Sequence, residues 1–186
     1  MNTNRQAGLS LVEVMVALLI SSILILGVTD LFNSSFMSGR TNSELAQIQE
    51  NGRLAMEVIG SDIRLAGLPT CLTKLNPGAE PLKNALALGG NQKSLTLKYV
   101  DPDNCRNNSP DELTITYTFD GTELKKDGQP LLSDVDGSFT LIPNNSTPEL
   151  ANAVLITIEI KSKDSNFKSR NFSSIYELKN RSIARN

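Results

Sequence analysis

Side chains that could carry out catalysis or bind a metal are scarce in this sequence of 186 residues, which contains no histidine and two cysteines. Histidine is the commonest general base and a common zinc ligand, so its absence disfavours a zinc enzyme or a triad hydrolase. The acidic cluster of Asp101, Asp103 and Asp111 has neither a nucleophile nor a base beside it. Its loop also lacks the spacing of an EF-hand calcium site. We therefore predict that the protein is not an enzyme and has no cofactor or metal.

The overall charge and the length narrow the class of protein further. The formal net charge is −2, so the surface carries no general excess of basic residues, and we do not expect nucleic acid as a direct ligand. A chain of 186 residues is long enough for one domain with a full core and an appendage. We therefore expect one globular body.

An apolar run near the amino terminus contains one early carboxylate, Glu13. The residues from Leu9 to Leu31 are about as many as a helix needs to cross a hydrocarbon layer, with Glu13 at one edge. Arg5 precedes the run and no basic residue follows before Arg40, which places the amino terminus in the cytoplasm by the positive-inside rule. We therefore expect a single-pass protein of the bacterial inner membrane whose body faces the periplasm.

The order of motifs around this run differs from that of an ordinary signal peptide. Secretory signals place small residues after their apolar stretch, whereas here Ala7 and Gly8 precede it. The stretch RQAGLSLVEVMVALLISSILILG resembles the signal of type IV prepilins and pseudopilins: a short basic leader ending in glycine, an apolar residue, and glutamate at the fifth position after the glycine. That resemblance implies a leader peptide of residues 1–8, cleavage between Gly8 and Leu9 by a prepilin peptidase, and methylation of the new amino terminus at Leu9.

Glu13 has two interpretations. A carboxylate near a membrane edge can extend to the lipid headgroups, as any charged side chain there does. Alternatively, the positively charged amino terminus of a neighbouring subunit offsets the cost of a carboxylate in hydrocarbon, about 2.5 kcal/mol or more. Such a pair would set the register between subunits. We favour the second interpretation and predict that Glu13 acts in subunit assembly.

Helical periodicity continues beyond the membrane segment. The predicted transmembrane and assembly half covers residues 9–32, and the amphipathic half covers residues 33–67. The second half carries one apolar stripe at spacings of three and four, formed by Leu45, Ile48, Gly52, Ala55, Ile59 and Ile63. The polar positions around it are Glu44, Gln47, Gln49, Glu50, Arg53, Glu57 and Asp62. Gly67 supplies a stop signal, and we expect a bend or a loosened turn between Gly27 and Gly39.

After this helix the periodicity changes to two, the spacing of strands with one buried face. The clearest segments are SLTLKYV, ELTITYTF and AVLITIEIK, and further candidates are GSFTLI, SSIYEL and a short strand near Leu124. Asp120-Gly121 and Asp127-Gly128 are typical of hairpin turns. Residues 70–94 and 101–111 are rich in glycine, proline, asparagine and serine and are predicted to be loops.

These elements predict an α+β fold in which the long amino-terminal helix packs on an antiparallel β-sheet, with a body of residues 68–186. The prepilin resemblance implies the same arrangement, a type IV pilin-like fold. Cys71 and Cys105 lie in the loops of this body. Because the body is expected outside the cytoplasmic membrane, a disulfide between them is favoured over two free thiols.

Three further stretches resemble the PilW family of minor pilins: QENGRLAMEVIGSDIRLAGLPTC, DGQPLLSDVDGSFTLI and SIYELKNR. The resemblance implies a subunit that forms a priming and tip complex with other minor pilins and initiates type IV pilus assembly, with roles in twitching motility, adhesion and DNA uptake. Its implied partners are other minor pilins, the major pilin, the prepilin peptidase, the inner-membrane assembly platform and, before assembly, membrane lipid. Its final location would be the pilus tip at the cell surface.

Two alternatives stay open. A J-type minor pseudopilin of a type II secretion system shares the helix and the Gly-Gln-Pro-Leu-Leu hairpin. A membrane-anchored envelope adhesin or binding domain would keep its original amino terminus and would need no cleavage at Gly8.

Overall fold

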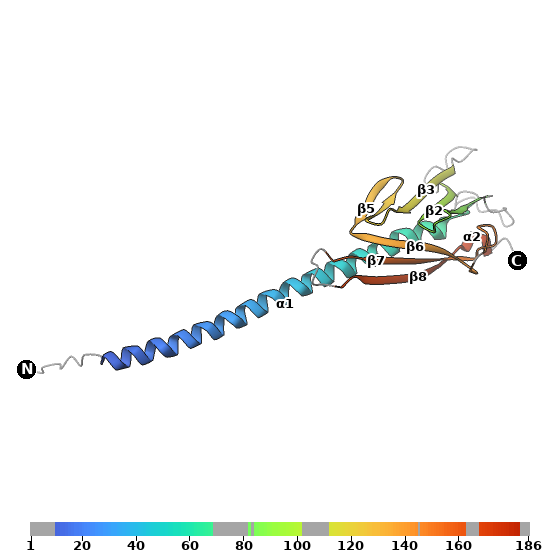
Figure 1. The fold of residues 1–186 in the computed structure, drawn as a ribbon. Coiled ribbons are helices and arrows are strands. Elements are labelled where there is room, and N and C mark those ends of the chain that lie inside the picture. The colour runs from blue at the N-terminus through green and yellow to red at the C-terminus, as the bar shows by residue number, and fades with distance from the viewer. Residues whose placement is uncertain are drawn as a thin grey trace, which may run out of the picture. The chain divides into compact units, whose positions relative to one another are not determined.

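A computed structural model describes residues 10–68, 82, 84–101, 112–144, 146–162 and 168–182. Its longest element is helix α1 (Leu11–Leu65). The chain forms two compact units, Met1–Ala46 and Gln47–Asn186. The first unit contains the amino-terminal part of α1, and the second contains the rest of α1 and the strands (Figure 1).

Within the first unit, α1 runs through its glycines without a break. The residues between Gly27 and Gly39 are helical throughout, so the predicted loosened turn does not occur there. A glycine costs about 1 kcal/mol relative to alanine inside a helix, which is small once a long helix has been nucleated and propagates cooperatively. The hydroxyl of Thr29 also donates to the carbonyl oxygen of Ile25, one turn earlier, at 2.7 Å, so this polar side chain is satisfied within the helix.

Two antiparallel sheets belong to the second unit (Figure 1). The five-stranded sheet has the order β1 (Leu86–Leu88), β2 (Ser94–Val100), β3 (Glu112–Phe119), β4 (Glu123–Lys126) and β5 (Gln129–Ser133). The three-stranded sheet has the order β6 (Val135–Ile142), β7 (Ala153–Ile160) and β8 (Arg170–Glu177). A short helix, α2 (Lys179–Ser182), follows β8.

The strands follow the alternation of apolar and polar residues. Every strand predicted from the sequence is confirmed, and in β2 and β7 alternate side chains are buried as expected. Asp127 and Gly128 have φ angles of 52° and 78° in the turn between β4 and β5, the left-handed conformation that this hairpin requires. Strand β1 corrects the prediction of a continuous loop, because Leu86 pairs with Leu97 of β2 and only 2% of it is exposed.

The body contains two sheets where one was expected. Asp134, the residue between β5 and β6, has a φ angle of 58°, and the chain leaves the five-stranded sheet at this point. The amide of Phe139 in β6 donates to the carbonyl oxygen of Gln92, which precedes β2, at 2.8 Å. The rings of Phe119 and Phe139 pack with their centroids 5.1 Å apart. Apolar side chains therefore join the two sheets in one core.

The second part of α1 packs against this core. The predicted stripe is buried from Ile48 to Ile63, and Ile59 and Ile63 have no exposed surface. These side chains form one hydrophobic cluster with residues of both sheets. Each fully buried Ile or Leu contributes roughly 1.5 to 3 kcal/mol of burial free energy. The α+β, pilin-like layout predicted from the sequence is confirmed.

Candidate functional site

Glu13 lies in the first turn of α1. The backbone amides of Glu13 and Val14 donate to the carbonyl oxygen of Ser10 at 3.0 and 3.2 Å, so the helix begins just before this carboxylate. The Glu13 side chain is exposed, and no residue in the described part of the chain pairs with it. A carboxylate in this position complements the partial positive charge of the helix amino terminus. Its geometry leaves it accessible to a group from outside the chain.

Four other predicted site residues lie outside the described part of the chain. These are Gly8 and Leu9, at the expected cleavage and methylation position, and the two cysteines, Cys71 and Cys105. Cleavage, methylation and the disulfide therefore stay predictions.

Large apolar side chains surround the first part of α1. Leu19, Leu24 and Leu31 are 64%, 63% and 72% exposed, and none of the most apolar 18-residue window is buried. By its length and composition, this helix can cross a membrane. A helix that is apolar all round needs an apolar environment, which lipid or neighbouring helices can provide.

Two glycines of α1 allow the three-stranded sheet to approach the helix closely. A side-chain carbon placed on Gly52 would lie 2.7 Å from two carbons of the Phe172 ring of β8. The same carbon placed on Gly60 would overlap the ring of Tyr176, two turns further along. Both rings therefore lie directly on the helix backbone. The guanidinium carbon of Arg64 lies 5.4 Å from the centroid of the Tyr176 ring, a cation–π contact at the same place.

A buried carboxylate attaches α1 to the five-stranded sheet. Only 8% of Asp62 is exposed. Its Oδ2 atom accepts a hydrogen bond from the Tyr117 hydroxyl at 2.5 Å and another from the Lys126 ammonium at 2.8 Å. The ammonium also lies 5.6 Å from the centroid of the Tyr117 ring. Helix α1 is thus bonded through one carboxylate to both β3 and β4.

The environment of Tyr117 opposes its ionisation. Burial raises the pKa of the Tyr117 hydroxyl far above its usual value of 10.0, and the hydrogen bond to Asp62 raises it further. Burial is also the main cause that raises the pKa of Tyr99, with the negative charge of Asp62 second. Tyr117 therefore stays a neutral donor to the Asp62 carboxylate.

The carboxyl-terminal end of α1 is capped from a distant part of the sequence. The side-chain amide of Asn180, in α2, donates to the carbonyl oxygens of Arg64, Leu65 and Ala66 at 3.2, 3.2 and 3.1 Å. These are carbonyls that a helix end leaves without an internal partner. Gly67 follows with a φ of 80°, the left-handed conformation that ends many helices.

The three stretches that resemble minor pilins all belong to the second unit. The first contains Gly52, Gly60 and Asp62. The second contains β5 and β6, whose Phe139 belongs to the buried cluster beneath the helix. The third contains Tyr176 and Asn180. We call the contacts of Gly52, Gly60, Asp62 and Asn180 the helix lock.

Sequence reasoning missed the central residue of the helix lock. It placed Asp62 among the outward polar positions, whereas the structure buries it. The available signal was its position three residues after Ile59 and directly before Ile63, at the border of the apolar stripe. Its partners are 55 and 64 residues away along the chain, so helical periodicity could not identify them.

Comparison with known families gives one match, at residues 3–29, to the family described as "Prokaryotic N-terminal methylation motif". The chain carries a prepilin-type methylation motif. This motif supports a type IV pilin or pseudopilin family, and it implies processing by a prepilin peptidase and assembly with other pilins. It indicates a structural protein and fits a membrane-anchored pilin. Among curated proteins and solved structures, none matches the chain.

Proposed function

We propose that the chain is a minor pilin that joins other minor pilins in a complex that primes type IV pilus assembly and stays at the pilus tip. The observation that carries the proposal is the methylation motif at residues 3–29, which leads into a helix whose apolar part is wholly exposed. The stretches that resemble the PilW family support the finer assignment. This helix would lie in lipid before assembly and among neighbouring helices after it.

The amino terminus would be prepared for assembly in two steps. A prepilin peptidase at the cytoplasmic membrane face would cleave between Gly8 and Leu9, and the amine of Leu9 would then be methylated. The new terminus would keep a positive charge, which can pair with the carboxylate of Glu13 on a neighbouring subunit. Because both charges would lie among apolar helices, a misplaced subunit would leave them unpaired, and the pair therefore favours one axial position.

The helix lock would hold the body in one position on the assembling helix. Its polar contacts come from the five-stranded sheet and from α2, and its two glycines leave room for rings of the three-stranded sheet. A slide of α1 by one turn would break every one of these contacts together. Pulling or packing forces on the helix would therefore be transmitted to the body without a change of register.

The proposed location follows from this topology. The subunit would be inserted in the inner membrane with its amino terminus in the cytoplasm and its body in the periplasm. It would then move to the pilus tip at the cell surface. Its partners would be other minor pilins, the major pilin, the prepilin peptidase and the inner-membrane assembly platform. Twitching motility, adhesion and DNA uptake are the processes that it would serve.

Deletion of the gene tests the proposed role. Loss of surface pili and of twitching, restored by the wild-type chain, is the expected result. Loss of exoprotein export with normal pili would instead identify a J-type pseudopilin of a type II secretion system. A Gly8→Val variant, whose side chain should block the peptidase, is expected to enter the membrane but fail to restore pili.

The mature amino terminus separates both pilin functions from an envelope adhesin. Mass spectrometry of the purified chain should find a methylated Leu9 at the amino terminus. A mature chain that begins at Met1 would contradict the pilin proposal and favour a permanently anchored binding protein.

A further inference from the structure

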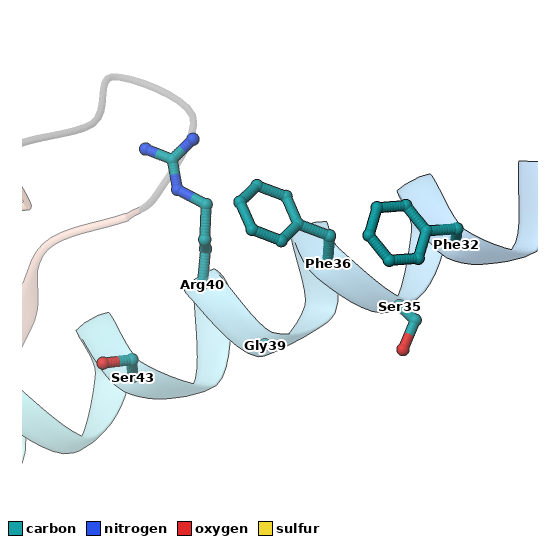
Figure 2. A pocket seen from close by; sticks show the side chains of 6 residues that line it. All are labelled: Phe32, Ser35, Phe36, Gly39, Arg40 and Ser43. Atoms are coloured by element: carbon teal, nitrogen blue, oxygen red, sulfur yellow. The ribbon is translucent and has the colours of Figure 1, made fainter. Parts of the chain in front are cut away.

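A groove runs along α1 within the first unit. It has a volume of about 510 Å³ and is lined by Phe32, Ser35, Phe36, Gly39, Arg40 and Ser43. The rings of Phe32 and Phe36 extend to one side of the helix, and Arg40 follows on the same side (Figure 2). The two phenylalanines are 73% and 57% exposed. The groove therefore has an apolar part and one cationic end.

The groove begins where the apolar part of α1 reaches the thickness of a membrane. Residues 11–31 of the helix extend about 30 Å, the thickness of the hydrocarbon core of a bilayer. Phe32 follows directly, and Phe36 lies about 6 Å further along the axis. Because the headgroup layer adds roughly 5 to 7 Å on each side of the core, Phe36 lies at its level. Arg40 lies about 6 Å beyond Phe36, and its long side chain can extend to the phosphates of the lipids.

Arg40 is the only charged residue among those that line the groove. It is also the only basic residue between Leu9 and Gly52, and none of the ion pairs among the described residues includes it. Asp30 lies ten positions earlier, which is about 15 Å along the helix axis and roughly 80° around it. Glu44 follows Arg40 by one turn and does not line the groove. The guanidinium is thus placed to bind an anion, and its planar donors suit a phosphate.

We propose that this groove binds an acidic phospholipid of the periplasmic leaflet, such as phosphatidylglycerol. Its acyl chain would lie against Phe32, its ester region beside Phe36 and its phosphate at Arg40. The side chains thus follow one another in the order of a phospholipid, from the apolar chain to the charged headgroup. The inference rests on the proposed function as a subunit of the inner membrane and adds a specific lipid to its surroundings before assembly. The bound headgroup would fix the depth of α1 in the membrane.

The charge of the groove favours an acidic lipid over a zwitterionic one. Phosphatidylethanolamine carries an ammonium group close to its phosphate, and no acid among the described residues lines the groove to accept that group. The positive charge of Arg40 would repel it. Phosphatidylglycerol carries hydroxyl groups in place of the ammonium, so only its phosphate charge meets the guanidinium. A soluble phosphate would leave both phenylalanine rings in water, whereas a lipid covers them as well.

A single fluorescent reporter tests the proposal, because the chain contains no tryptophan. Phe36→Trp places an indole in the groove and keeps an aromatic wall. The full chain is reconstituted in vesicles of phosphatidylethanolamine and phosphatidylglycerol in equal amounts, with bromine on the acyl chains of one lipid or of the other. Bromine quenches an indole that it contacts. Brominated phosphatidylglycerol should quench more strongly, with a preference of about fivefold for the acidic lipid. Leu19→Trp, within the apolar span, is the matched control and should be quenched equally by both lipids.

Three variants in the Phe36→Trp chain test the role of Arg40. Arg40→Gln should abolish the preference for phosphatidylglycerol, because the amide is uncharged. Arg40→Lys should keep part of it, since the charge remains without the planar pair of donors. Arg53→Gln removes an exposed arginine of the same helix that lies outside the groove and pairs with Glu50 at 3.4 Å, and it should keep the full preference.

Three results would overturn the proposal. The first is equal quenching of the Phe36→Trp chain by the two lipids, and the second is a preference that survives Arg40→Gln. The third is no quenching of Phe36→Trp by either lipid while Leu19→Trp is quenched, which would show that lipid does not fill the groove. Normal pili together with any of these results would leave the minor-pilin function standing. A failure of the deletion test described above would count against that function instead.

Discussion

Replacing Asp62 with alanine should weaken the attachment of α1 to the five-stranded sheet. The Tyr117 hydroxyl would lose its acceptor in a buried position, which costs about 1 to 3 kcal/mol. The Lys126 side chain is 33% exposed and can turn toward water, so the loss of its ion pair adds only about 0 to 1 kcal/mol. We expect a decrease of about 1 to 4 kcal/mol in the free energy of unfolding of the second unit.

A double-mutant cycle isolates the bond between helix and sheet. Tyr117→Phe removes the hydroxyl and leaves the ring in place, and the double variant Asp62→Ala/Tyr117→Phe removes both ends of the bond. The coupling free energy from the cycle should be about 1 to 2 kcal/mol. Glu57→Ala is the matched control, because Glu57 is an exposed acid on the same helix, and it should change the stability by no more than about 0.5 kcal/mol.

Urea unfolding of the full chain in mild detergent, followed by far-ultraviolet circular dichroism, measures these differences. Detergent covers the exposed apolar part of α1 and keeps it from aggregating. The cooperative unfolding transition in urea therefore reports on the second unit. A coupling free energy indistinguishable from zero, or an effect of Asp62→Ala no larger than that of Glu57→Ala, would refute the assignment of Asp62 to the helix lock.

The hydrogen bond between Tyr117 and Asp62 also predicts that the stability of the folded chain depends on pH in the alkaline range. The folded state raises the pKa of Tyr117 above its usual value of 10.0, so the folded chain keeps a proton that the unfolded chain loses. This contribution to stability is fully present below pH 10 and is lost as the pH rises toward the folded-state pKa. Tyr117→Phe should therefore reduce the loss of stability above about pH 10. An unchanged dependence of the unfolding free energy on pH above about pH 10 would contradict the prediction.

Three further predictions concern the rest of the chain. Gly60→Ala should lower the free energy of unfolding by about 1 kcal/mol, because overlap with the ring beneath it exceeds the gain in helix propensity; Gly39→Ala, which meets no neighbour, should not lower it. Glu13→Ala should preserve membrane insertion and leader cleavage yet abolish entry into pili, as judged by immunoblots of sheared filaments, and normal entry would exclude an assembly role. The mass of the periplasmic chain under non-reducing conditions should show a disulfide between Cys71 and Cys105, and thiol labelling of both residues without reductant would disprove it.

The elements that could be predicted are those whose pattern repeats locally. The apolar stripe from Ile48 to Ile63 identifies the buried face of α1, because side chains three and four positions apart share one helix face. Alternation identifies β2, β3 and β7 in the same way. Asp127-Gly128 marks its hairpin, because that turn needs two positive φ angles and few residues adopt them readily.

Other features depend on contacts that local patterns do not contain. Strand β1 has three residues, too few to show a period, and it exists because it pairs with β2. The chain passes from one sheet to the other at Asp134, and the φ angle of 58° at this residue is not part of any repeating pattern in the sequence. The role of Asn180 as a cap depends on its meeting a helix end more than 110 residues earlier in the chain.

By itself the sequence determined the methylation motif, the apolar helix and the place of Glu13 near its start. These are properties of composition and spacing, and they hold whatever the rest of the chain does. Only the tertiary structure explains why positions 52 and 60 need glycine, and why an acid, Asp62, lies on the buried side of α1. The reason is physical: space and hydrogen-bond partners at these positions are supplied by β8, β3 and β4, and folding alone brings those strands to α1.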